Sequence, residues 1–449
     1  MLSDVSHLPL SLLYVVVFVL GAILGAFANY VVDALGLTPR YRSAWRKLPT
    51  EYISARPARH WYERLPLFGA LTLAPVVFAS SKSRASARSA SGGVSVIPGW
   101  EGRWFWLRLF LVELLFALLI LWRFSVWTRY GVTAHTVGGW GIETVFYWLA
   151  LCASLVDLDD YVIPDLIIIP GAALGLILTT FVPLDGSFFP LTRFPLDFTG
   201  ERYSYSIALW LGAVARRLGL HCSVSTLLTL LLALAWSFWN FSLLDRRFYP
   251  GKLGWGRAAK LFLRRIVRSP LTPVVGLCWL LGLFALLGLM ILEPISAPRG
   301  ANFSPSHFDL LTNSFLGLCV GALLIWAVRL IGGASLGREA MGFGDVLLGG
   351  VIGSFLGWQG AVVVFFLAPF LGMVFGLTRR AVGAQTEIPY GPFLCLASLV
   401  YLIKLDFFTG IFAVYFDDPV FIAIVGAIGF VLLAVMLLAL RVLKSTLRG

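Results

Sequence analysis

The chain has 449 residues, of which 59% are hydrophobic and 13% charged, and its mean hydropathy is +0.87. Apolar runs of roughly the bilayer-spanning length recur along it, which indicates a polytopic membrane protein. The formal net charge is +12, but the basic residues gather in alternate loops. That distribution is typical of cytoplasmic loops and argues against nucleic-acid binding.

The expected fold is all-α, a helical membrane bundle of about eleven spans. The candidate spans are residues 10–32, 104–122, 142–156, 166–182, 226–244, 271–292, 310–331, 346–358, 361–377, 392–408 and 420–440. Residues 10–32 lack a basic segment before them and are longer than a signal-peptide core. We therefore expect them to be the first membrane span and not a signal peptide. The apolar stretch 204–218 ends in basic residues and is predicted to lie in the membrane interface.

The loop 36–103 is rich in arginine and lysine, which predicts a cytoplasmic loop and an N-terminus outside. Alternation of the spans then places Asp157, the basic segment 245–269 and Asp345 on the cytoplasmic side, and the C-terminus as well. The two aspartates are therefore predicted to face the same compartment.

Asp157 and Asp345 each lie where an apolar segment meets a polar loop. An ionisable group at a bilayer boundary is costly to desolvate, and a pair of them on one side suggests proton chemistry. Gly342 and Gly344 flank Phe343 in the sequence GFGD and allow backbone conformations that bring Asp345 to the head of the next helix. Two close carboxylates cannot easily both ionise, so one can accept a proton from water while the other donates one to a peptide carbonyl.

Each motif alone has an ordinary explanation. An acidic residue that ends an apolar helix is usually a solvated stop signal, and Asp159, Asp160 and Asp165 make this loop generally acidic. A short glycine-rich sequence before a helix is often only a turn. Their combination on one membrane face favours a catalytic pair.

Four stretches in this order resemble the type IV prepilin peptidases, a family of GxGD-type membrane aspartyl proteases. Asp157 to Asp165, with its Pro-Asp pair, resembles the first motif of that family, and Met341 to Asp345 the second. The segment 107–118 with Glu113 is similar to the family's entry into the second span. Residues 388–393, Ile-Pro-Tyr-Gly-Pro-Phe, look like a late motif of the family.

The resemblance implies a membrane aspartic endopeptidase that removes the leader of type IV prepilins or type II secretion pseudopilins at the cytoplasmic face of the bacterial inner membrane. Asp157 and Asp345 would be the catalytic pair, with Gly342, Gly344, Asp160 and Asp165 in support. The implied partners are the prepilin or pseudopilin substrate and the lipid bilayer. The oligomeric state is left open.

The chain departs from that family in three places, one of which is the apolar run Val346 to Leu348 after Asp345, where relatives often carry a lysine. Many relatives carry paired CxxC zinc motifs after the first span, whereas residues 54–73 contain no cysteine. A thiolate zinc site cannot be built there, so we predict no metal and no cofactor, and amino-methyl transfer stays open. The spacing between the two aspartate motifs is also unusually long, which predicts an insertion of two spans and a basic cytoplasmic loop.

The predicted organisation is a first span (1–35), a basic cytoplasmic loop without a zinc motif (36–103), spans with the first aspartate (104–182), the insertion (183–308) and spans with GxGD (309–449). Two alternatives stay open: a proton-coupled transporter, and a catalytically inactive scaffold of pilus assembly. The first would be expected to show a second similar half, which the sequence lacks by eye.

Overall fold

The structure of the chain is a computed structural model, which describes part of it in long segments and part only as isolated residues. The described residues are 10–36, 65–69, 71, 105–129, 131–181, 229–230, 233–234, 236–237, 240, 256–257, 260–261, 264, 268, 272–292, 307–336, 341–381, 389–405, 407–408, 426, 428 and 431. Predicted features at 204–218, most of 226–244 and most of 420–440 lie outside them.

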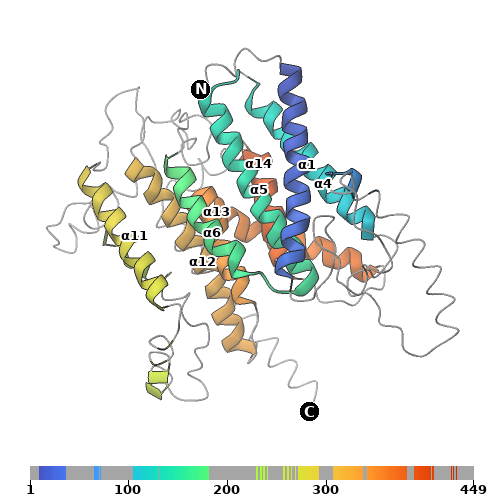
Figure 1. The fold of residues 1–449 in the computed structure, drawn as a ribbon. Helices are drawn as coiled ribbons and strands as arrows, with labels where there is room; N and C mark the ends of the chain where they lie inside the picture. The colour runs from blue at the N-terminus through green and yellow to red at the C-terminus, as the bar shows by residue number, and fades with distance from the viewer. Residues whose placement is uncertain are drawn as a thin grey trace. The chain divides into compact units, whose positions relative to one another are not determined.

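Every long element of the described residues is an α-helix (Figure 1). They are α1 (Leu10–Leu35), α4 (Phe105–Trp127), α5 (Ala134–Asp160), α6 (Asp165–Phe181), α11 (Thr272–Leu292), α12 (His307–Leu336), α13 (Phe343–Ala381) and α14 (Gly391–Ile403). The all-α prediction is confirmed for this part of the chain.

Five helical stretches are long and apolar enough to cross a membrane. They are Ser11–Leu35, Leu107–Trp127, Thr136–Asp160, Asn313–Gly333 and Phe343–Thr378. Helices Asp165–Phe181, Val275–Gly288 and Gly391–Ile403 are apolar but shorter. By their length and composition, the described helices therefore fit a multi-pass membrane protein.

The chain divides into two compact units, and the boundaries fall within helices. The first unit contains α1, α4, α5, the start of α6 up to Gly171, and residues Gly376–Cys395. The second contains the rest of α6 from Ala172, α11, α12, α13 up to Phe375, and α14 from Leu396.

In the first unit, α1 packs closely along α4 because α1 has glycine where the helices cross (Figure 1). A Cβ atom at Gly21 would lie 2.7 Å from the Cα of Ala117, and one at Gly25 would lie 2.7 Å from the Cα of Glu113. This is the small-residue spacing that lets membrane helices approach to backbone contact. Helix α5 joins the pair, since the indole of Trp148 donates to the carbonyl of Leu24 at 3.0 Å.

In the second unit, α12 and α13 meet along a seam of four glycines, Gly317, Gly321, Gly349 and Gly353. A Cβ at Gly349 would lie 2.7 Å from the carbonyl oxygen of Gly321, and Gly353 meets the carbonyl of Gly317 in the same way. Ser314 adds a hydrogen bond across the seam, donated by its Oγ to the carbonyl of Ser354 at 2.5 Å. Backbone proximity of this kind replaces the hydrophobic effect, which does not drive association within lipid.

Helix α13 is interrupted once, at Gly357, whose backbone has φ 71° and ψ 177°. Only glycine adopts that conformation without strain. The sequence predicted two separate spans, 346–358 and 361–377, with a break between them. In the structure two helices meet at a kink at Gly357, close to the expected break.

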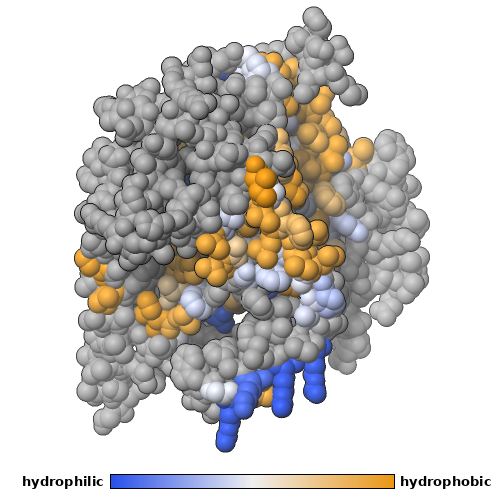
Figure 2. All heavy atoms as spheres, turned by 90° about the vertical axis from the view of Figure 1, so that its left-hand side faces the viewer, coloured by the Kyte–Doolittle hydropathy of each residue, from blue (hydrophilic) through white to orange (hydrophobic). Residues whose placement is uncertain are grey.

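The surface carries many large apolar side chains, which Figure 2 shows in orange. Leu115 on α4 is 60% exposed and Phe284 on α11 is 73% exposed. Such exposure is unfavourable in water but ordinary for a surface that faces lipid.

Candidate active site

Asp157 lies in the last turn of α5, and the ends of that helix are well defined. The helix begins at a capping box, in which the Thr136 amide donates to the Oγ1 of Thr133 at 3.2 Å. It ends at Tyr161, which is left-handed (φ 56°) and donates its amide to the carbonyl of Asp157 at 2.9 Å. The left-handed backbone conformation is uncommon for tyrosine. It ends the helix, so the chain changes direction just after the aspartate.

The Asp157 side chain is buried, with 5% of its surface exposed. The backbone amide of Gly391 donates a hydrogen bond to its carboxyl group. The Oδ2 atom of Asp157 is buried and has no hydrogen-bond partner among the described residues. A carboxyl oxygen in that state is expected to be satisfied by water or substrate, because leaving it unpaired is costly.

Gly391 is the first residue of α14, so the carboxyl group of Asp157 lies at a helix amino terminus. The unpaired amides and the dipole at that end favour a negative charge. Gly391 of the late motif therefore meets Asp157 of the first motif in space. Both motifs can be recognised in the sequence, but nothing in the sequence indicates that Gly391 contacts Asp157.

The other acidic residues of the first motif have different surroundings. Asp159 accepts two hydrogen bonds from Arg108 of α4, at 2.7 Å and 3.1 Å. Asp160 is the last residue of α5, and Asp165 is the first residue of α6, where an acidic residue favours the helix dipole. Asp157 is the most buried of the four, which distinguishes it from its neighbours.

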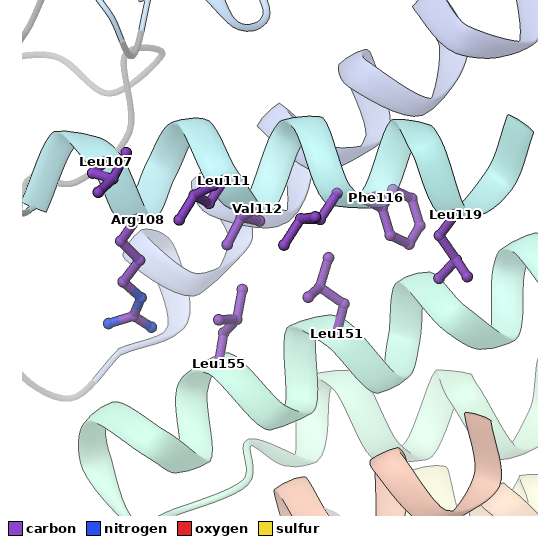
Figure 3. Close-up of a pocket in the computed structure, with 9 residues that line it drawn as sticks. Leu107, Arg108, Leu111, Val112, Phe116, Leu119, Leu151 and Leu155 are labelled. Atoms are coloured by element: carbon purple, nitrogen blue, oxygen red, sulfur yellow. The ribbon is translucent and has the colours of Figure 1, made fainter. Parts of the chain in front are cut away.

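An apolar groove runs between α4 and α5 beside this end of the unit (Figure 3). It has a volume of about 470 Å³ and is lined by Leu107, Arg108, Leu111, Val112, Leu115, Phe116, Leu119, Leu151 and Leu155. Arg108 is the one charged residue that lines it, and Leu155 lies two residues before Asp157.

The second motif begins α13 in the other unit. Asp345 is the third residue of that helix and is partly exposed, again at an amino terminus. A Cβ at Gly342 would lie 3.3 Å from the Oδ2 of Asp345, so the glycine leaves room for the carboxylate. Phe343 stacks under the guanidinium of Arg329 at 5.2 Å, which ties the loop to α12. The next three residues, Val346 to Leu348, are buried and anchor the helix start.

The predicted site residues thus fall into two groups. Asp157, Asp160 and Asp165 belong to the first unit, and Gly342, Gly344 and Asp345 belong to the second. The meeting of Asp157 with Asp345 stays a prediction.

Glu113, which the sequence singled out only by resemblance, is a buried structural acid. Its carboxylate accepts a hydrogen bond from Asn29 Nδ2 at 3.1 Å and one from the Leu67 amide at 2.5 Å. Leu67 is left-handed (φ 65°) and belongs to the described turn of the predicted cytoplasmic loop. Glu113 therefore fastens that loop to α1 and α4.

The pair Arg123 and Glu143 was not singled out by the sequence. Arg123 Nε donates to Glu143 Oε2 at 2.8 Å, and its Nη2 donates to Oε1 at 2.7 Å. Charged residues inside apolar spans are rare, so a charged residue within or next to each of two predicted spans could have identified this pair from the sequence.

The region predicted to lack a zinc motif lies mostly outside the described residues. Among the residues that are described, no cluster of three or more His, Cys, Asp or Glu side chains could hold a metal ion. The expectation of no metal stays a prediction.

Five of the described helices are of membrane length, and α5 and α13 among them each carry an aspartate at one end. One aspartate is buried in the last turn of its helix, and the other follows a glycine in the first turn of its helix. These features define an integral membrane protein with acidic residues at helix ends. Residues 271–377 match the model of the type IV leader peptidase family. This match confirms, for that segment, the resemblance to the type IV prepilin peptidases. The matched range contains Gly342, Gly344 and Asp345 and begins after Asp157.

Several curated proteins are similar over about a hundred residues. The "Prepilin leader peptidase/N-methyltransferase" of Aeromonas salmonicida (strain A449) is 31% identical over 102 residues, which are 22% of this chain and 35% of that protein. The Pseudomonas aeruginosa protein of the same name is 32% identical over 104 residues, 22% and 36% of the two chains. The "Type 4 prepilin-like proteins leader peptide-processing enzyme" of Escherichia coli O78:H11 is 34% identical over 95 residues, 20% and 34%.

The chain thus spans about a third of the length of the curated relatives it matches. No solved structure matches it.

Proposed function

We propose that this chain is a membrane aspartic endopeptidase that removes the leader peptide from type IV prepilins or type II secretion pseudopilins. The observation that carries the proposal is the match of residues 271–377, which include GFGD, to the type IV leader peptidase family. The names of the similar proteins supply the substrate class. This match favours a peptidase over a transporter and over an inactive scaffold.

In the proposed reaction, Asp157 and Asp345 share one proton. The ionised member removes a proton from water, and the resulting nucleophile attacks the scissile carbonyl as the protonated member donates to its oxygen. The buried Oδ2 of Asp157, unpaired among the described residues, supports a role for that side chain in binding a water molecule. Gly342 leaves space beside the carboxylate of Asp345. Asp160 and Asp165 are proposed to have supporting roles, because they stand at the helix ends on either side of the turn after Asp157.

The proposed location is the bacterial inner membrane, with about eleven spans, the N-terminus outside and the C-terminus in the cytoplasm. The five membrane-length helices support a multi-pass protein. The distribution of basic residues among the loops supports the orientation.

The proposed lipid contact involves a basic helical face before α11. Arg257, Lys260, Arg264 and Arg268 are all helical and exposed, and their spacing of three or four residues places them along one side of a helix. Figure 2 shows a row of strongly hydrophilic side chains along the lower edge of this view. Anionic headgroups are the partners that such a face meets at a membrane surface.

The relatives' names also include N-methyltransferase. The proposal for this chain is limited to the peptidase activity, since residues 54–73 lack the cysteines that accompany methylation in relatives.

The test is cleavage of a prepilin by the purified full chain in lipid nanodiscs, followed by mass spectrometry of the new amino terminus. Asp157→Asn and Asp345→Asn are each expected to abolish cleavage. Asp159→Asn is the matched control, because its carboxylate is bound to Arg108 rather than to the α14 amino terminus. It is expected to retain measurable cleavage. Persistent cleavage in both catalytic variants would rule out the aspartate mechanism, and an inactive wild type would reject the peptidase.

A further inference from the structure

We propose that Gly391 is a positioning residue for Asp157. Its missing side chain makes room for the carboxyl group, and its backbone N–H fixes the orientation of that group. The inference concerns the reaction assigned above and so rests on the proposed function, although the contact itself can be tested without any activity.

The steric part of the argument starts from the space at Gly391. A Cβ atom there would lie 2.5 Å from Oδ2 and 3.3 Å from Cγ of Asp157, and 3.0 Å from Cδ1 of Ile163. Both neighbours are buried, Asp157 at 5% and Ile163 at 4% exposure, so neither has solvent to move into. The carboxyl group is the end of a rotatable side chain, and it is therefore the group that a methyl at position 391 would displace.

The second part concerns which amides at the start of α14 remain available. Pro392 has no N–H. The amides of Phe393 and Leu394 both donate to the carbonyl of Tyr390, at 3.0 Å and 3.3 Å. In this first turn, the Gly391 amide is therefore the one directed to the Asp157 carboxyl group. The helix start has a single donor for the aspartate, and its place depends on residue 391.

These two features together orient the carboxyl group. The N–H of Gly391 donates to the carboxyl group. Oδ2 is the carboxyl atom nearest to position 391, and it has no hydrogen-bond partner among the described residues. That is the arrangement expected for an aspartate whose second oxygen must be available to water. Any residue larger than glycine would rotate the carboxyl group away from it.

The activity test compares Gly391→Ala with Gly141→Ala. Gly141 lies on α5, the helix that carries Asp157, and a Cβ there meets nothing within 4 Å. For Gly391→Ala we expect kcat to fall by about 100-fold with KM nearly unchanged, because a displaced reacting group slows the chemistry without weakening substrate binding. Gly141→Ala is expected to keep wild-type kcat. Equal kcat values in the two variants would overturn the inference.

Ile163→Val separates the two neighbours of position 391, since valine lacks the Cδ1 atom that the new methyl would approach. If displacement of Asp157 causes the loss, Gly391→Ala stays slow in the Ile163→Val background. Full recovery of kcat there would assign the loss to crowding of Ile163 and overturn the inference.

A stability cycle tests the contact independently of cleavage. Melting temperatures are measured for Gly391→Ala in the wild type and in Asp157→Ala, which removes the carboxyl group. We expect the loss in the second background to be about half of that in the first or less. Gly25→Ala, which crowds the backbone of Glu113 instead, should cost the same in both. Equal losses for Gly391→Ala would reject the contact, whereas an inactive wild type with a positive cycle would reject only the peptidase.

Discussion

Both terminal nitrogens of Arg108 donate hydrogen bonds to the carboxylate of Asp159, at 2.7 Å and 3.1 Å. The pair joins the start of α4 to the end of α5, two residues beyond Asp157. A planar guanidinium that meets both carboxylate oxygens fixes an angle as well as a distance. The pair therefore sets how the helix end that carries Asp157 lies against α4.

Arg108→Lys is expected to weaken this pair, because an ammonium group cannot make the same two-point contact. The Arg108 side chain is 38% exposed, so the loss should be modest, about 0.5–1 kcal/mol. Denaturant unfolding in mixed micelles would measure it. A double-mutant cycle with Asp159→Asn is the control, and additive effects would show that the pair does not couple the helices.

The buried pair of Arg123 and Glu143 should be far more sensitive. Their side chains are only 10% and 5% exposed, and removal of one partner leaves the other charge buried. Glu143→Leu alone is expected to cost about 3–5 kcal/mol. The double change Arg123→Met with Glu143→Leu should recover most of that loss. A double variant as unstable as the single one would contradict this account.

Glu113→Leu should release the turn at Leu67. The substitution removes the acceptor of the Leu67 amide while leaving an apolar side chain of similar length within the span. Hydrogen–deuterium exchange of a peptide that covers residues 65–71 is expected to accelerate, with little change in peptides from α5. Asn29→Ala, which removes only the second donor, should have a smaller effect on that peptide. Unchanged exchange in both variants would mean that Glu113 does not fasten the loop.

The glycine seam between α12 and α13 predicts an asymmetric response to alanine. Gly349→Ala would push a methyl against the carbonyl of Gly321 and should destabilise the chain by roughly 1–3 kcal/mol. Gly376→Ala, also on α13, meets nothing within 4 Å and should be neutral or stabilising by roughly 0.5–1 kcal/mol. Similar melting temperatures for the two variants would argue against the seam.

Hydrophobic pattern was sufficient to locate most helices that the structure describes. The predicted spans 10–32, 104–122 and 271–292 overlap α1, α4 and α11, because the requirement for an unbroken apolar stretch acts on the local sequence. The ends were less accurate. Helix α5 begins at Ala134, well before the predicted residue 142, since the capping box at Thr133 and not hydropathy decides where it starts.

The sequence by itself determined the helical membrane class and the resemblance carried by GFGD, because both depend on the order of residues along the chain. Contacts between distant segments were decided only by the tertiary structure. Asp157 and Gly391 are separated by more than two hundred residues. A local sequence pattern cannot relate two positions so far apart. Their juxtaposition depends on how α5 and α14 pack, and packing is a property of shapes in three dimensions.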